Sequence, residues 1–106
     1  MRDLREHAVF VAVQVSGEIA GWLGVFVYRS VEADARAEIS GLVVDEKVRS
    51  RGIGRRLLDR AESWAREAGC RSIGLRSNVI RDQAHEFYLR YGYRHIKTQK
   101  SFRKDL

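Results

Sequence analysis

The chain has 106 residues, which is enough for one domain with a single hydrophobic core. With 44% hydrophobic and 32% charged residues, it has the composition of a soluble globular protein rather than a disordered one. There is no apolar run of the roughly 20 residues that a membrane span needs, no signal-peptide core, and only one cysteine, Cys70, which excludes an internal disulfide. We therefore expect a single domain over residues 1–106, in the cytoplasm and without a membrane partner.

The net charge of +6 indicates an anionic partner. Nucleic acid is one candidate, because clustered arginines neutralise backbone phosphates. Here the positive charges are spread along the chain and do not alternate with aromatic residues as in single-strand binders. A phosphorylated cofactor needs only a local cluster of arginines, and residues 49–56 supply one. We favour such a cofactor, or an unspecialised basic surface, over nucleic acid.

Alternating apolar residues predict a β-hairpin near the start of the chain. Valines at every second position from 9 to 15 predict a half-buried strand over Ala8–Val15. The turn Ser16-Gly17 leads into a second strand, Ile19–Tyr28. Gly21 and Gly24 within that strand indicate a bulge or a close backbone approach. The aromatic residues of the second strand share one face and are expected to pack on the core; they are Trp22, Phe26 and Tyr28.

The centre of the chain predicts a strand, a helix and another strand. After a polar loop, Ala37–Val44 is expected to be a third antiparallel strand. The helix from about Ile53 to Ala68 ends at Gly69, and its apolar stripe consists of Ile53, Leu57, Leu58, Ala61, Trp64, Ala65 and Ala68. The strand Arg71–Arg76 should then lie parallel to Ala37–Val44 through a right-handed crossover. A ligand is expected at the carboxyl end of Ala37–Val44.

The last third of the chain predicts one more helix and one more strand. The helix runs from about Arg81 to Tyr91 and ends at Gly92. Residues Tyr93–Phe102 are expected to form a strand, followed by a frayed basic end.

The segment before the long helix has the features of an anion site. Gly52 and Gly54 leave the backbone amides bare, and these amides are the unpaired donors of a helix start. The positive end of the helix dipole and the surrounding arginines favour a phosphate or pyrophosphate there. Neither the P-loop motif nor the dinucleotide fingerprint is present.

The remaining pattern, Arg-x-x-Gly-x-Gly after a strand, consists of Arg49, Gly52 and Gly54. It resembles the signature of the GNAT N-acetyltransferase superfamily, whose loop grips the pyrophosphate of acetyl-CoA. Residues 77–93, with an Ala-x-x-Phe-Tyr helix followed by glycine and an aromatic residue, resemble the second signature of the same superfamily. Together the two signatures span residues 37–93, and the preceding hairpin matches the family's usual second and third strands.

The resemblance implies an α/β fold with a mixed sheet, similar to the GNAT acyl-CoA N-acyltransferases but lacking their usual first strand and first two helices. Either the chain is a fragment, or a partner subunit covers the exposed side. The sheet edge near Ala8–Val15 favours pairing with a second copy, as a homodimer.

The resemblance also implies an activity, namely acetyl transfer from acetyl-CoA to an amine of a small molecule, peptide or protein. The amine attacks directly in a ternary complex, and no metal is involved. The implied cofactor-binding residues are Leu42, Val43 and Val44 through main-chain groups, Arg49, Ser50, Arg51, Gly52, Ile53, Gly54 and Arg55 at the pyrophosphate, and Asn78 at the pantetheine. Asn78 could equally be a helix cap or a turn residue.

Two residues are implied to act in catalysis. Tyr88 corresponds to the family's usual general acid, and Glu38 matches the glutamate base of histone-type members; His85 or water are alternative bases. Without the resemblance, Tyr88 would be assigned to the core and Glu38 to a solvated strand. The alternative function is a non-catalytic module that binds CoA or an acidic polymer, and a nucleic-acid-binding domain is the more distant possibility.

Overall fold

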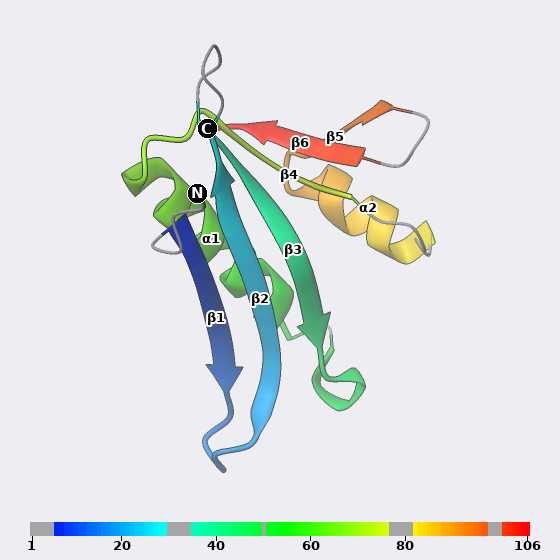
Figure 1. The fold of residues 1–106 in the computed structure, drawn as a ribbon. Coiled ribbons are helices and arrows are strands. Elements are labelled where there is room, and N and C mark those ends of the chain that lie inside the picture. Colours follow the sequence, from blue (N-terminus) through cyan, green and yellow to red (C-terminus); the bar gives the residue numbers. More distant parts are fainter. Residues whose placement is uncertain (1–5, 30–34, 50, 77–81, 98–100) are drawn as a thin grey trace.

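A computed structural model describes residues 6–29, 35–49, 51–76, 82–97 and 101–106. One mixed sheet has the strand order β1-β2-β3-β4-β6-β5, and both helices lie against it (Figure 1). The elements are β1 (His7–Val13), β2 (Ile19–Tyr28), β3 (Arg36–Val44), the short 3-10 helix η2 (Glu46–Val48), α1 (Ile53–Glu67), β4 (Ser72–Arg76), α2 (Asp82–Arg90), β5 (Arg94–Lys97) and β6 (Ser101–Asp105).

The predicted hairpin, third strand and crossover helix are confirmed. β1, β2 and β3 form an antiparallel ladder, and α1 then connects β3 to the parallel strand β4. The β3–β4 pairing is short, because it begins at Arg36 and ends at Ile39. Beyond Ile39 the two strands diverge, as Figure 1 shows.

Both glycines of β2 have the role that the sequence indicated. The ladder slips between Gly24 and Val25, where Ser40 is the extra residue on β3, which makes a β-bulge. A Cβ on Gly21 would lie 2.6 Å from the carbonyl oxygen of Val43, so the backbones approach too closely for a side chain. The bulge lies at the position where β3 leaves β4.

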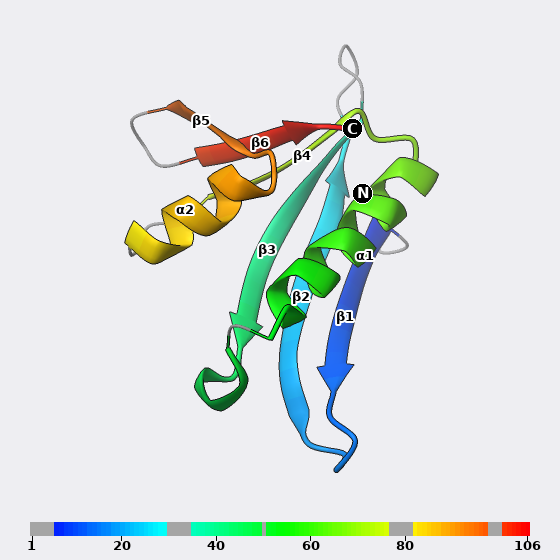
Figure 2. The same cartoon turned by 180° about the vertical axis from the view of Figure 1, so that it is seen from behind.

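The two helices cover the same face of the sheet. The predicted apolar stripe of α1 is buried through Leu57, Leu58, Ala61 and Ala65. Figure 2 shows α1 crossing in front of β1 and β2 when the molecule is seen from that side. α2 adds Tyr88 to the same buried cluster, with its ring 5.7 Å from that of Phe102. In the described ranges, no helix is long and apolar enough to cross a membrane.

The opposite face of β1–β3 is open, which corrects one prediction. Trp22, Phe26 and Tyr28 share this open face and do not pack on the core. Trp22 and Tyr28 are 40% and 61% exposed, and Phe26 is half-buried. The residues of β2 that α1 covers are the alternate ones, Leu23, Val25 and Val27. The valines of β1 likewise lie on the open face, while Ala8, Phe10 and Ala12 pack against the core.

The C-terminal region also differs from the prediction. Instead of one strand followed by a frayed end, it forms a hairpin of β5 and β6. β6 continues to Asp105 because it pairs along the whole of β4, where its Phe102 lies opposite Leu75 and is buried. The segment is therefore a strand because it pairs with the side of β4 that faces away from β3.

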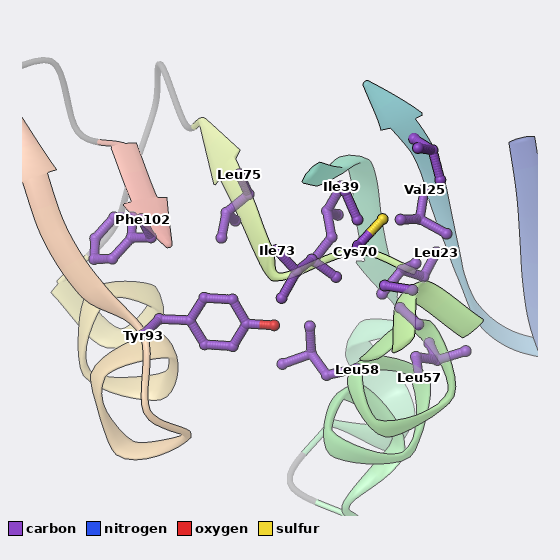
Figure 3. Close-up of a cluster of buried hydrophobic side chains, with 14 of the residues drawn as sticks. Leu23, Val25, Ile39, Leu57, Leu58, Cys70, Ile73, Leu75, Tyr93 and Phe102 are labelled. Carbon is purple, nitrogen blue, oxygen red and sulfur yellow. The ribbon is translucent and has the colours of Figure 1, made fainter. Parts of the chain in front are cut away.

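A buried carboxylate joins α1 to this C-terminal region. Glu62 is 5% exposed and accepts hydrogen bonds from the Tyr93 hydroxyl at 2.9 Å and from Lys104 Nζ at 3.1 and 3.2 Å. Figure 3 shows the Tyr93 ring extending toward Leu58 of α1. Burial, followed by the neighbouring Glu62 carboxylate, raises the pKa of Tyr93 well above its usual value. The sequence analysis did not single out this cluster.

Candidate active site

The divergence of β3 and β4 leaves one side of β3 without a neighbouring strand. Leu42, Val43 and Val44 pair with β2 on one side only, opposite Leu23, Trp22 and Gly21. In the described part of the chain, no strand pairs with their other side. Buried backbone groups need hydrogen-bond partners, so an extended ligand between β3 and β4 would be stabilised there.

The head of α1 lies at the end of this opening. Gly52 is its N-cap, with φ of 80°, and in the described ranges no side chain caps the helix. The first turn contains Arg55 and Arg56 and no acidic residue. Positive side chains at the positive end of a helix dipole are unfavourable by themselves, whereas a bound anion reverses that effect. The uncapped amides and the arginines together therefore form a site suited to phosphate.

The arginines differ in their contacts. Arg49 donates from Nε to the carbonyl oxygen of Val44 at 3.3 Å, which fixes it at the end of β3. Arg55 lies 4.0 Å from Asp59 and 5.7 Å from the centre of the Tyr91 ring. Arg51 is exposed beside Gly52. Two predicted contacts, Ser50 and Asn78, lie outside the described residues.

α2 approaches the head of α1. A Cβ on Gly54 would lie 3.2 Å from the Phe87 ring, so Gly54 allows the helices to pack closely. The neighbouring residue, Tyr88, is 9% exposed, and its hydroxyl forms no hydrogen bond with the described residues. Burial raises the pKa of Tyr88 to about 12. Tyr88 therefore keeps its proton at any ordinary pH, as a general acid must. The side chain of His85 is not among those described.

Glu38 lies on the open face of the sheet, opposite the helices. It pairs with Phe26 of β2 and with Gly74 of β4, one residue before the last β3–β4 pair. Its side chain is half-buried. Glu38 and Tyr88 are therefore on opposite faces of the sheet, on either side of the opening between β3 and β4.

An aromatic residue that the sequence placed in the core lies close to this opening. A Cβ on Gly41 would be 2.7 Å from Cη2 of Trp22, so the indole ring lies against the backbone of β3. The partial exposure of Trp22 leaves its other side open to a ligand. This position of Trp22 could not be predicted from the sequence, because the alternation of a strand does not say which of its faces is covered.

Cys70 is unsuited to act as a nucleophile. Its side chain is buried, and burial raises the pKa of the thiol. A buried thiol of raised pKa is a poor nucleophile. Among the described residues, no group of three or more His, Cys, Asp or Glu side chains could hold a metal ion.

A mixed sheet divided between two parallel strands, with an uncapped arginine-rich helix start at the gap, is an arrangement suited to a phosphorylated ligand that lies along a strand. A sequence model of the Acetyltransferase (GNAT) family matches residues 1–93. The chain belongs to this family.

Three known proteins illustrate the similarity. The chain is 39% identical to an aminoalkylphosphonate N-acetyltransferase of Salmonella typhimurium over 81% of its length, and 30% identical to an aminoglycoside N(6')-acetyltransferase type 1 of Stenotrophomonas maltophilia over 95%. It spans 58% of the first protein and 69% of the second. The NatC complex bound to Gag peptide and CoA has the same fold, with a TM-score of 0.81, 19% identity, and coverage of 92% of this chain and 70% of the matched chain.

Proposed function

We propose that this chain transfers an acetyl group from acetyl-CoA to an amine, by direct attack of the amine in a ternary complex. The observation that carries this proposal is the uncapped head of α1, with Gly52 at φ of 80°, next to the unpaired side of β3. The two named relatives support an amine acceptor, because aminoalkylphosphonates and aminoglycosides both carry amino groups. A cytoplasmic location and a homodimer paired through β1 stay predictions from the sequence.

The described residues are suited to acetyl-CoA. Main-chain groups of Leu42, Val43 and Val44 would hold the pantetheine arm along β3, and residues 49–55 would hold the pyrophosphate. Acetyl-CoA supplies an activated thioester, which an amine can attack without a covalent enzyme intermediate. Holding both reactants together replaces an encounter in solution with a reaction at fixed geometry.

Proton transfer is the task of the chain's own side chains. An alkylamine such as lysine has a pKa near 10.4, so at neutral pH a base has to remove its proton before attack. Glu38 is suited to this role, because it lies beside the opening and forms no ion pair with the described residues. Tyr88, whose pKa is raised by burial, keeps its proton at ordinary pH and is suited to give it to the leaving thiolate.

Tyr88→Phe is expected to lower turnover by on the order of 100-fold, the lower end of a typical general-acid contribution, with little change in acetyl-CoA affinity. Stability should be retained, since the hydroxyl has no hydrogen bond to lose within the described chain. Tyr93→Phe is the matched control. It removes the hydroxyl that bonds to Glu62, so it should lower stability by about 1 kcal/mol and leave turnover unchanged. Equal turnover in both variants would contradict the role of Tyr88.

The function itself is tested by following free thiol release while the chain is incubated with acetyl-CoA and a panel of amines. Calorimetric titration with acetyl-CoA, and melting curves with acetyl-CoA or DNA, are measured in parallel. Binding together with amine-dependent thiol release supports the transferase. Binding without release supports the alternative, a non-catalytic CoA-binding module. Stabilisation by DNA alone would contradict both.

A further inference from the structure

The open face of the sheet carries two opposite charges on either side of Gly74. Glu38 on β3 and Arg103 on β6 are each the direct partner of Gly74 on β4. Neighbouring strands lie about 4.8 Å apart, so the Cα atoms of Glu38 and Arg103 are separated by about 10 Å. The two charged side chains therefore lie on the same face with only one strand between them.

Close packing of the backbone keeps the space between them free of another side chain. A Cβ on Gly74 would lie 2.7 Å from the carbonyl oxygen of Phe102, and 3.5 Å from Nε of Arg103. The first distance explains why residue 74 is glycine, because the backbone of β6 cannot give way there. The second distance shows that the Arg103 side chain leans over β4, toward Glu38.

The two charges do not neutralise each other. In the described part of the chain, neither Glu38 nor Arg103 forms an ion pair, although both are half-buried. The next arginine in the same row, Arg94 of β5, behaves differently, since it lies 3.4 Å from Asp105. A separated acid and base beside the opening between β3 and β4 can hold a ligand that carries both charges.

We propose that the amine acceptor is a compact molecule that also bears an anionic group, a carboxylate or a phosphonate, and that Arg103 binds this anion. The inference rests on the proposed function. The planar guanidinium offers paired donors to either anion. With the anion on Arg103, the amine is directed to Glu38 at the opening, which positions it for attack. Arg103 thus determines acceptor specificity and takes no part in proton transfer.

The test compares acceptors of equal chain length, namely 3-aminopropylphosphonate, 4-aminobutyrate and the neutral 3-amino-1-propanol. We expect kcat/KM for each anionic acceptor to exceed that of the amino alcohol by at least about tenfold. Arg103→Gln should lower this ratio by about tenfold, to near unity, mainly through KM, as expected for loss of a hydrogen bond to a charged group. The two anions distinguish a carboxylate from a phosphonate as the natural group.

Arg94→Gln is the matched control, because it removes one positive charge from the same row but at an arginine already paired with Asp105. It should leave the ratio unchanged. Arg103→Lys should keep part of the preference, since the charge stays but the paired donors are lost. If neutral amines or peptide N-termini react as well as the anionic acceptors, the inference about Arg103 is wrong. It is also wrong if Arg103→Gln and Arg94→Gln change the preference for anionic acceptors equally. In either case the proposed transferase activity is unaffected. If acetyl-CoA binds but no acceptor releases thiol, both fail.

Discussion

Gly52→Val is expected to weaken acetyl-CoA binding by about 100-fold, measured as Kd by calorimetric titration. Gly52 is the N-cap of α1, and a Cβ there would meet no described atom within 4 Å. We expect a valine side chain in that open space to block the approach of the phosphates to the amides at the head of α1, which are proposed to bind them. Two hydrogen bonds to a charged group, at about 1.5 kcal/mol each, account for a loss of this size.

The same change also strains the backbone, so it needs a control that separates strain from blocking. A β-branched residue at positive φ costs about 1–2 kcal/mol. Gly69→Val carries the same cost, because Gly69 has φ of 87° and equally open surroundings, but it lies at the other end of α1. Both variants should lose similar stability, and only Gly52→Val should lose affinity. Equal affinities would contradict a phosphate site at the head of α1.

Glu62→Ala is expected to lower the free energy of unfolding by about 3 kcal/mol, the largest effect on stability that we predict. The carboxylate is buried and bonded to both Tyr93, which directly precedes β5, and Lys104 of β6. Its removal leaves a buried hydroxyl and an ammonium group without their acceptor and creates a cavity. Urea unfolding should show a lower midpoint with an unchanged slope.

Two further variants define the cause of this loss. Glu67→Ala, on an exposed position of the same helix, should change stability by less than about 0.5 kcal/mol. Glu62→Met combined with Lys104→Met should recover part of the loss, because an apolar pair of similar volume replaces the charges. A double variant as unstable as Glu62→Ala would show that the ion pair is not the cause.

Local patterns in the sequence determined most of the elements and the expected phosphate site. The apolar period of 3.6 residues in α1 and the glycine that ends it are features of the helix's own residues. Such a helix can therefore be predicted without knowledge of the tertiary structure. The bare amides around Gly52 and the nearby arginines are also adjacent along the chain. For the same reason the parallel pair β3–β4 followed from the strand–helix–strand order.

The tertiary structure decided which face of each strand is buried. In β1, valines alternate with Ala8, Phe10 and Ala12, so both faces are apolar and the period is the same whichever side the helices cover. Because α1 covers the side of Leu23 and Val25, Trp22 is left on the open face. The sequence predicted that the residues of each strand alternate between two faces, and only packing determined which face is buried.

The contacts between distant residues were likewise beyond the sequence. Glu62 borders the apolar stripe of α1, but its partners Tyr93 and Lys104 lie 31 and 42 positions further along the chain. Arg103 lies in a segment that was expected to be frayed, and it lies one strand away from Glu38 only because β6 pairs with β4. Residues 65 positions apart in the chain become neighbours across one strand through the order β3-β4-β6, which no local pattern encodes.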